Sequence, residues 1–187
     1  PLPATARPAL VLARPVSAPH ALGTMTILVV VSDHGFGHAT RTVAWLRSAL
    51  ALEPRLKARV LCGSGAESLL RHSFAAEPRV RVREGESDPG MLLFPGTLRV
   101  DTPGTGTAWR GWMSRWGKWV EAHLDEALGV DGVLCDVAPA GLLLAERAGV
   151  RAALLGNFAW TDTLAWHLPS ELFERLHATG RLAEASF

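Results

Sequence analysis

The chain has 187 residues, of which 48% are hydrophobic and 20% are charged, and its formal net charge is +1. This balance is typical of one globular domain and excludes a largely disordered chain. The near-zero charge and scattered arginines exclude the basic footprint of a nucleic-acid-binding protein, and no apolar run approaches the roughly 18 residues of a transmembrane segment.

The first 24 residues are rich in proline and alanine and contain no acidic residue. This composition predicts a disordered leader or upstream sequence over 1–24, and Met25 stands directly before the first strand. A targeting segment is the alternative, although its apolar piece at 9–13 is short for a secretory signal. We therefore expect the folded domain over 25–187.

Strands and helices alternate through the rest of the chain. Apolar and β-branched runs predict strands at 26–31, 58–62, 80–83, 132–135 and 151–155. Helical periodicity and capping signals predict helices at 38–52, 66–72, 108–128, 139–149 and 170–178. The loop expected at 84–107 is rich in glycine and proline, and its length indicates a functional or mobile segment.

Such alternation predicts an α/β fold, a Rossmann-like doubly wound parallel sheet of about five or more strands. In doubly wound order, the strands 26–31 and 132–135 are neighbours, and the crevice lies outside their carboxyl ends. The turn after the first strand and the residue after the fourth should therefore meet. We expect His34 and His38 to face Asp136 there.

His38 begins the helix after this glycine-flanked turn, and Asp136 is its candidate partner. A histidine can take a proton at neutral pH, and a buried carboxylate would fix its tautomer and stabilise its protonated form. A histidine that merely caps the helix is an equal alternative. His34 either lines the site or fills the turn.

Two other interpretations of the turn are disfavoured. Gly35 and Gly37 form half of a dinucleotide fingerprint, but Thr40 occupies the place of the third glycine, which argues against NAD or ATP. A metal site built from Asp33, His34 and His38 lacks a second pair of ligands and helical alignment.

Aromatic and amide side chains elsewhere leave alternatives open. Four tryptophans at helical spacing predict a buried or interface stripe, with an acceptor-binding wall as the alternative; they are Trp109, Trp112, Trp116 and Trp119. Asn157 follows the fifth strand and either binds a substrate hydroxyl or stabilises its loop. Cys62 and Cys135 favour free thiols in a reducing, cytoplasmic compartment.

Three motifs in this order resemble the N-terminal half of a GT-B fold glycosyltransferase. The turn at 34–41, His-Gly-Phe-Gly-His-Ala-Thr-Arg, is similar to the first glycine turn of UDP-glycosyltransferases and of the bacterial N-acetylglucosaminyltransferase of peptidoglycan synthesis. The likeness is greatest to the glycosyltransferase-like region of plant arabinokinases, which also has Asp-Val-x-Pro and Asn-Phe-x-Trp segments. Here those segments are 136–139 and 157–160, and the likeness covers 25 to about 166.

The resemblance implies transfer of a sugar from a nucleotide-sugar donor to a hydroxyl of a small-molecule or lipid acceptor, with no metal or other cofactor. His38 matches the general base and Asp136 the aspartate that orients it. The remaining residues of the site would bind substrate; they are His34, Gly35, Phe36, Gly37, Arg41, Asn157 and Trp160.

The resemblance also implies a second, C-terminal domain that holds most of the donor nucleotide. That domain would begin where this chain ends, at Phe187, so the chain is expected to be a fragment that is inactive alone. A non-catalytic sugar- or partner-binding module is the alternative function.

Overall fold

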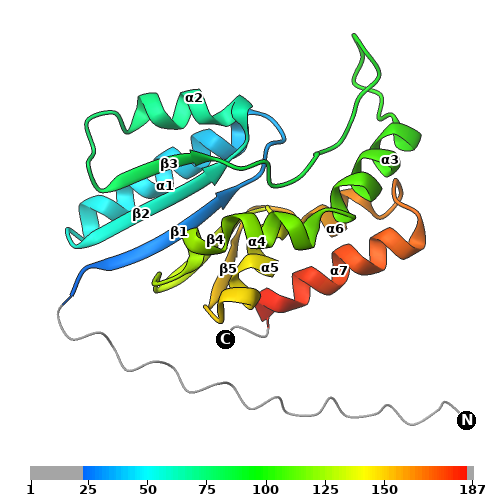
Figure 1. Ribbon diagram of the computed structural model, residues 1–187. Helices are drawn as coiled ribbons and strands as arrows, with labels where there is room; N and C mark the ends of the chain where they lie inside the picture. Colours follow the sequence, from blue (N-terminus) through cyan, green and yellow to red (C-terminus); the bar gives the residue numbers. More distant parts are fainter. Residues whose placement is uncertain (1–22, 185–187) are drawn as a thin grey trace, which may run out of the picture.

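The computed structural model describes residues 23–184, so the leader expected at 1–24 lies almost entirely outside the described residues. Five parallel strands form one sheet in the order β3-β2-β1-β4-β5 (Figure 1). Their bounds are β1 Met25–Val31, β2 Leu56–Cys62, β3 Val80–Glu84, β4 Gly132–Asp136 and β5 Ala152–Leu155. The predicted parallel sheet, with β1 beside β4, is confirmed.

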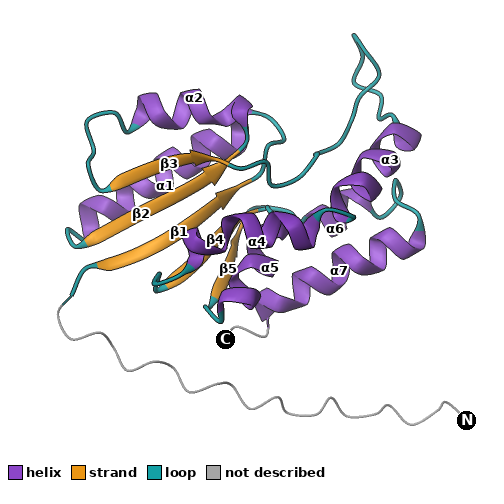
Figure 2. Ribbon diagram, in the orientation of Figure 1, coloured by secondary structure: helices purple, strands orange, loops and turns teal. Residues whose placement is uncertain are grey.

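Helices cover both faces of this sheet (Figure 2). Their bounds are α1 Phe36–Leu52, α2 Ser64–Ser73, α3 Thr102–Met113, α4 Trp116–Ala127, α5 Pro139–Ala148, α6 Trp160–Leu164 and α7 Ser170–Glu184. Apolar side chains of α1 and α2 pack on one face, and those of α4 and α5 pack on the other. The predicted doubly wound, Rossmann-like architecture is therefore confirmed.

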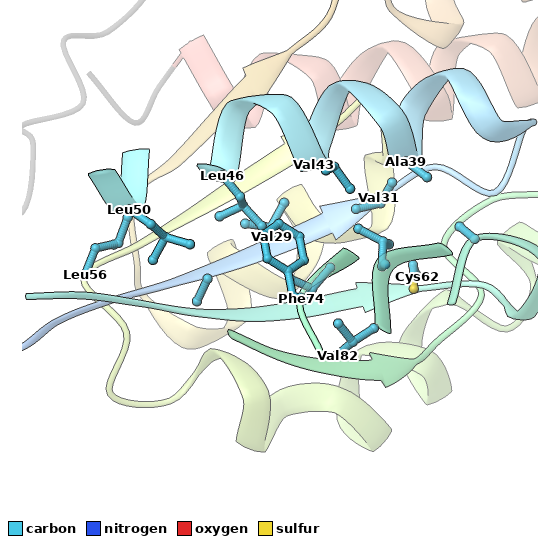
Figure 3. Packing of buried hydrophobic residues seen from close by; sticks show 14 residues of the cluster. Val29, Val31, Ala39, Val43, Leu46, Leu50, Leu56, Cys62, Phe74 and Val82 are labelled. Carbon is cyan, nitrogen blue, oxygen red and sulfur yellow. The ribbon is translucent and has the colours of Figure 1, made fainter. Parts of the chain in front are cut away.

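The central strand β1 is buried on both faces. Val29 and Val31 face α1 (Figure 3), whereas Leu28 and Val30 pack in the cluster on the other face of the sheet. All four side chains have no solvent exposure. Burying a side chain of this size contributes roughly 1.5–3 kcal/mol, which explains why an uninterrupted apolar run occupies the centre of the sheet.

The single helix predicted over 108–128 is wrong. The chain forms α3 and α4 instead, and the break at Ser114–Arg115 is bridged by hydrogen bonds such as Arg115 N–H to Trp112 O at 2.9 Å. The break lets Trp109 and Trp112 pack with α6 and α7 while Val120 of α4 packs against the sheet. The tryptophan stripe is mainly core, as its spacing favoured.

Other parts of the chain also differ from the predictions. The helix α7 continues through Gly180 to Glu184, because Leu182, beyond the glycine, packs against the apolar cluster between the sheet and α5, which offsets the low helix propensity of glycine. A short helix, α6, follows Asn157 where the sequence predicted only a loop. The long loop is shorter than expected, over 85–101, because Asp101 caps α3 through the backbone N–H of Gly104.

Candidate active site

The candidate site lies where β1 and β4 end side by side. Val31 pairs with Asp136 in the register of the two strands, and Ser32 N–H donates to the carbonyl of Asp136 at 3.0 Å. Because the strands are parallel and adjacent, the turn after β1 and the end of β4 share one edge of the sheet. The proximity that the topology predicted is therefore present.

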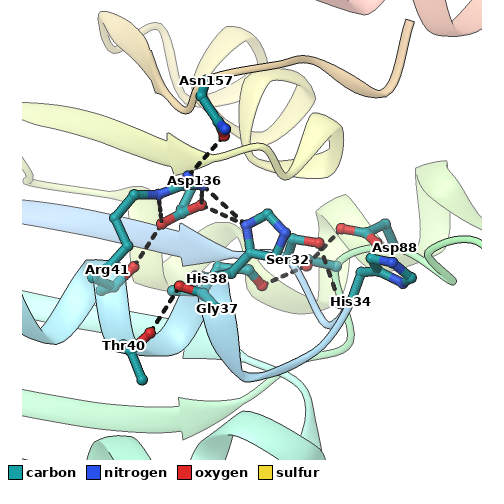
Figure 4. A network of polar contacts seen from close by, with 12 residues as sticks. Ser32, His34, Gly37, His38, Thr40, Arg41, Asp88, Asp136 and Asn157 are labelled. Atoms are coloured by element: carbon teal, nitrogen blue, oxygen red, sulfur yellow. Dashed lines mark hydrogen bonds and ion pairs between the residues drawn. The ribbon is translucent and has the colours of Figure 1, made fainter. Parts of the chain in front are cut away.

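His38 is the third residue of α1, and its ring turns toward Asp136 (Figure 4). Its Nδ1 lies 2.8 Å from Asp136 Oδ1, and only 6% of the residue is exposed. The N-cap of α1 is Gly35, with no side-chain capping bond, so the alternative that His38 caps the helix is wrong. Nδ1 also lies 3.0 Å from Arg41 Nη2, which only donates. We assign the hydrogen to Nδ1 because the nearer partner is the carboxylate, which only accepts, and this leaves the lone pair of a neutral ring on Nε2.

Asp136 is fully buried and accepts hydrogen bonds from three side chains. Besides His38, Thr42 Oγ1 donates to Oδ2 at 3.0 Å, and Arg41 donates through Nε to Oδ2 at 3.1 Å and forms an ion pair with Oδ1 through Nη2. Burial by itself would raise the pKa of Asp136, but these donors and the arginine charge hold it below its usual value. The carboxylate is therefore ionised at neutral pH.

Arg41 was expected to bind substrate, and the structure shows that most of its donors are already used. Its Nη1 donates to Asn157 Oδ1 at 3.3 Å, so one guanidinium joins Asp136 to the loop after β5. The hydrogen bond to Asp136 raises the pKa of Arg41. Its side chain is 30% exposed and Asn157 is exposed, and the substrate roles of both residues stay predictions.

His34 lies on the same edge of the site, joined to His38 by a row of aromatic rings. Its ring contacts Trp160 edge to face at 5.2 Å between centroids; Trp160 meets Phe158 at 5.9 Å, and Phe158 meets His38 at 5.9 Å. Trp160 is only 2% exposed, so it forms part of the packed wall behind His34. Its role in substrate binding stays a prediction.

The remaining residues of the turn are exposed. Phe36 has 64% of its surface in solvent, Gly35 adopts a φ of 79°, and the Gly37 carbonyl accepts a hydrogen bond from Thr40 Oγ1 at 3.0 Å. Phe36 and the backbone of the two glycines are thus accessible at the mouth of the site. Their contact with substrate stays a prediction.

The sequence analysis missed a group of buried polar residues below the turn. Asp33 accepts hydrogen bonds from Ser87 N–H at 2.9 Å and from Gly63 N–H, and Ser87 Oγ donates to the Val31 carbonyl at 2.6 Å. These bonds attach the segment 85–91 to the end of β1. The length of the loop was the one signal in the sequence that pointed to this segment.

Two carboxyl groups in this network have raised pKa values. Burial raises the pKa of Asp33 to about 6, although hydrogen bonds from Ser87 and Gly63 oppose the shift. Burial likewise raises the pKa of Asp88 to about 7, against the hydrogen bond from Ser32. Neither carboxyl group contacts His38 or Asp136, so they form a second polar layer beneath the candidate site.

The described residues offer no support for the disfavoured metal interpretation. Over 23–184, no three histidine, cysteine, aspartate or glutamate side chains are grouped closely enough to hold a metal ion. Within the same range, no helix combines the length and apolarity needed to cross a bilayer.

Comparisons with known proteins give one sequence relative and several structural ones. No family model matches the chain. The chain is 26% identical over 167 residues to L-arabinokinase of Arabidopsis thaliana, and the match covers 82% of this chain but 15% of that protein.

Among solved structures, the chain is similar to UGT89C1 of Arabidopsis thaliana complexed with UDP-L-rhamnose, with a TM-score of 0.55 and 12% identity, over 83% of this chain and 42% of that one. It is also similar to UGT71G1 of Medicago truncatula complexed with UDP-glucose, with a TM-score of 0.53 and 16% identity. This match covers 70% of this chain and 29% of that one. The chain thus spans less than half the length of each relative, and identities this low show the fold alone.

Proposed function

Because the chain has a GT-B glycosyltransferase-like fold, we propose that it is the acceptor-side half of a glycosyltransferase that uses a nucleotide-sugar donor. The observation that carries this proposal is the buried hydrogen bond between His38 Nδ1 and Asp136 Oδ1. It holds the ring with Nδ1 toward the carboxylate and Nε2 away from it, and a general base would use the Nε2 lone pair.

In the proposed reaction, His38 Nε2 removes the proton of an acceptor hydroxyl. The hydroxyl oxygen attacks the anomeric carbon of the donor sugar, and the bond between that carbon and the phosphate oxygen breaks. The nucleoside diphosphate leaves with the bonding electron pair. Asp136 stabilises the imidazolium that forms, and the step requires neither a metal nor another cofactor.

Arg41 and Thr42 have a positioning role in this proposal. Their hydrogen bonds hold Asp136 in one orientation and keep it ionised, so the carboxylate can in turn orient His38. Orientation of the base matters because proton transfer requires hydrogen-bond distance in the reacting complex.

The proposal also includes a donor-binding domain beyond this chain. The similar solved structures hold UDP-sugars, and the chain covers 29% and 42% of their length. We therefore place the nucleotide site mainly outside residues 1–187 and expect little transfer by this chain alone. Cytoplasmic location is part of the same proposal, and the two free, buried cysteines support it.

The test is a comparison of turnover in the longer protein, measured as nucleoside diphosphate released from UDP-sugars with a panel of acceptors. His38→Ala should lower kcat at least about a hundredfold, the low end for a general base. His72→Ala on the exposed surface of α2 is the matched control and should leave kcat unchanged. Unchanged turnover in His38→Ala would contradict the proposal.

One observation favours a second candidate, a sugar- or partner-binding module without catalysis. Arg41 neutralises Asp136, and this reduces the electrostatic help that the carboxylate gives to a protonated imidazole. Calorimetry of the chain with sugars and glycolipids, together with its mass in solution, tests this candidate. Binding without any turnover in the longer protein supports it, whereas no binding by a monomeric chain counts against it.

A further inference from the structure

The hairpin at 92–101 exposes a group of large apolar side chains. It projects from the body between β3 and α3 (Figure 1). The exposed fractions are 91% for Leu98, 44% for Leu93, 41% for Phe94 and 39% for Leu92. Single exposed apolar side chains are ordinary on a protein surface, but several on one projecting hairpin form a patch that marks contact with another molecule.

Both faces of this hairpin carry exposed apolar side chains. Leu93 pairs with Val100 across the hairpin, and Phe94 N–H donates to the carbonyl of Arg99 at 2.9 Å. Successive residues of a strand point to opposite faces, so Leu93 and Phe94 lie on opposite sides. Their similar exposure shows that the described part of the chain, 23–184, covers neither side. A flat protein surface would cover one side only, whereas lipid acyl chains can surround both.

The turn of the hairpin satisfies polar groups internally. The carbonyl of Phe94 accepts from Thr97 N–H at 3.1 Å and from the Thr97 hydroxyl at 2.9 Å, and Thr97 Oγ1 accepts from Arg99 N–H at 3.1 Å. Pro95 has no N–H to satisfy. Polar groups that are already paired cost less free energy when they leave water, so this turn is suited to an apolar environment.

The charges at the hairpin fit a layer of phosphate groups. Arg99 is the one charged residue in the sequence from Met91 to Val100. Its guanidinium carbon lies 5.7 Å from the centre of the Phe94 ring. An arginine in this position can keep its charge at the headgroups while its stem and its aromatic neighbour lie among apolar groups.

An exposed tryptophan lies beside the base of the hairpin. The Thr102 hydroxyl, directly after the hairpin, is 2.9 Å from His167 Nδ1, and the preceding residue, Trp166, is 89% exposed. Indole rings are enriched at the boundary between lipid headgroups and acyl chains. The surface around the hairpin thus combines an apolar tip with the residue types found at a bilayer surface.

We propose that the hairpin 92–101 inserts into the surface of a lipid bilayer, with Leu98 and the turn among the acyl chains and Arg99 at the phosphate layer. The segment 85–91 directly before it is attached to the end of β1, so insertion holds the mouth of the candidate site close to the bilayer. This inference goes beyond the proposed function and does not depend on it.

The first measurement is flotation of the 187-residue chain with lipid vesicles. One set contains phosphatidylcholine alone, and the other also contains phosphatidylserine. We expect the chain to bind both, because apolar insertion does not require an anionic surface. Absence of binding to either set, or binding that requires phosphatidylserine, would overturn the inference.

Two leucine variants matched in charge locate the contact. Leu98→Asp should lower the partition coefficient about tenfold or more, since burial of one leucine side chain contributes at least that factor. Leu52→Asp is the control, because Leu52 is 85% exposed at the end of α1, near the opposite edge of the sheet. It should bind like the wild type, and an equal loss in the two variants would overturn the inference.

The depth of insertion is measured with a nitroxide label on Leu98→Cys or Leu52→Cys. The native thiols of Cys62 and Cys135 are buried, and burial raises the pKa of both, so the reagent labels the new exposed thiol. Vesicles should shield the label at 98 from a water-soluble nickel chelate and leave the label at 52 accessible. Equal access to both labels would overturn the inference.

A second copy of the chain is the competing occupant of the hairpin. Sedimentation without lipid distinguishes the two, and a monomer that binds vesicles supports insertion. A dimer that Leu98→Asp dissociates, together with no vesicle binding, would overturn it. His38→Ala should bind vesicles like the wild type, so membrane binding and turnover can fail independently of each other.

Discussion

Asp136 and Asp88 are two buried carboxyl groups at the same edge of the sheet with opposite electrostatics. Asp136 accepts from His38, Arg41 and Thr42, and its pKa is held down. Among the residues that the structure describes, no cation hydrogen-bonds to Asp88, and burial raises its pKa to about 7. Arg41 pairs with Asp136, so Asp136 is ionised at neutral pH. Asp88 has no such partner among the described residues and is close to half-protonated.

This difference predicts how Asp88 affects stability. An unfolded aspartate has a pKa near 3.9, so between about pH 4 and pH 7 the folded protein holds a proton that the unfolded chain releases. Asp88 therefore makes the free energy of unfolding fall as the pH rises through this range, by an amount on the order of 2 kcal/mol between pH 5 and pH 8.

The measurement is chemical unfolding of the wild type and Asp88→Asn at pH 5 and pH 8. The amide does not titrate, so the variant should lose less stability than the wild type over this range. Asp33 acts in the same direction and His34 in the opposite one, and both are present in each protein, so the difference between the two profiles isolates Asp88. Parallel profiles would contradict the assignment.

The sequence predicted that His38 and Asp136 lie together, but it did not predict the buried polar residues next to them. His38 and Asp136 were identifiable because parallel topology brings the ends of β1 and β4 together, whatever the distance along the chain. Asp88 and Ser87 lie in a loop with no periodicity, so their burial depends on tertiary contacts that no local pattern reports.

The segment between β3 and α3 contains two parts with different roles. Residues 85–91 are attached to the turn after β1, whereas 92–101 form a projecting hairpin in which Leu93 pairs with Val100 (Figure 1). Leu98 at its tip is 91% exposed. The first part thus belongs to the candidate site, and the second makes few contacts with the body.

Two glycines in this segment make a matched test. Gly90 and Gly96 both adopt a positive φ, of 65° and 70°, so alanine at either position costs about 1–2 kcal/mol in backbone strain. A Cβ at Gly96 meets nothing within 4 Å, but one at Gly90 lies 2.4 Å from His34 Nδ1. Gly90→Ala should therefore destabilise the protein more and shift the His34 ring signals in NMR spectra.

Gly96→Ala, the control, should lower the free energy of unfolding without any change in the His34 spectrum. If both variants left His34 unchanged and cost the same free energy, the contact between this segment and the ring would not hold the ring in place.

Elements with strong local sequence patterns lie close to their predicted positions, whereas elements whose bounds depend on tertiary packing differ from the predictions. β1 starts at Met25, one residue earlier than predicted, because Met25 pairs with Leu56 of β2. The break between α3 and α4 was missed because the tryptophan spacing continues across it. Gly180 predicted a helix end, but α7 continues past it, and Leu182 packs against the apolar cluster between the sheet and α5.

The whole domain depends on close contact between its layers, and Gly141 is a point where α5 lies directly against the sheet. A Cβ at this position in α5 would lie 2.6 Å from Cys135 Sγ and 2.9 Å from Val30 Cβ, both in the sheet. The helix therefore approaches the strands more closely than any larger residue allows.

Gly141→Ala should lower the free energy of unfolding by about 1–3 kcal/mol, the usual cost of overpacking. Gly117→Ala in α4 is the control, since its Cβ meets nothing within 4 Å; alanine there should raise stability by up to about 1 kcal/mol through helix propensity. Thermal and urea unfolding of both variants give the comparison, and an unchanged Gly141→Ala would show that α5 can move outward freely.

The pairing of β1 with β4 joins parts of the chain that are about a hundred residues apart, and Asp136 reaches His38 only through it. In a nascent or partly denatured chain that has formed only β1, α1 and β2, the imidazole of His38 is therefore not yet hydrogen-bonded to Asp136. The ring signals of His38 should then report the pairing of β1 with β4, and a chain interrupted between β3 and β4 should lack this signature whatever its helical content.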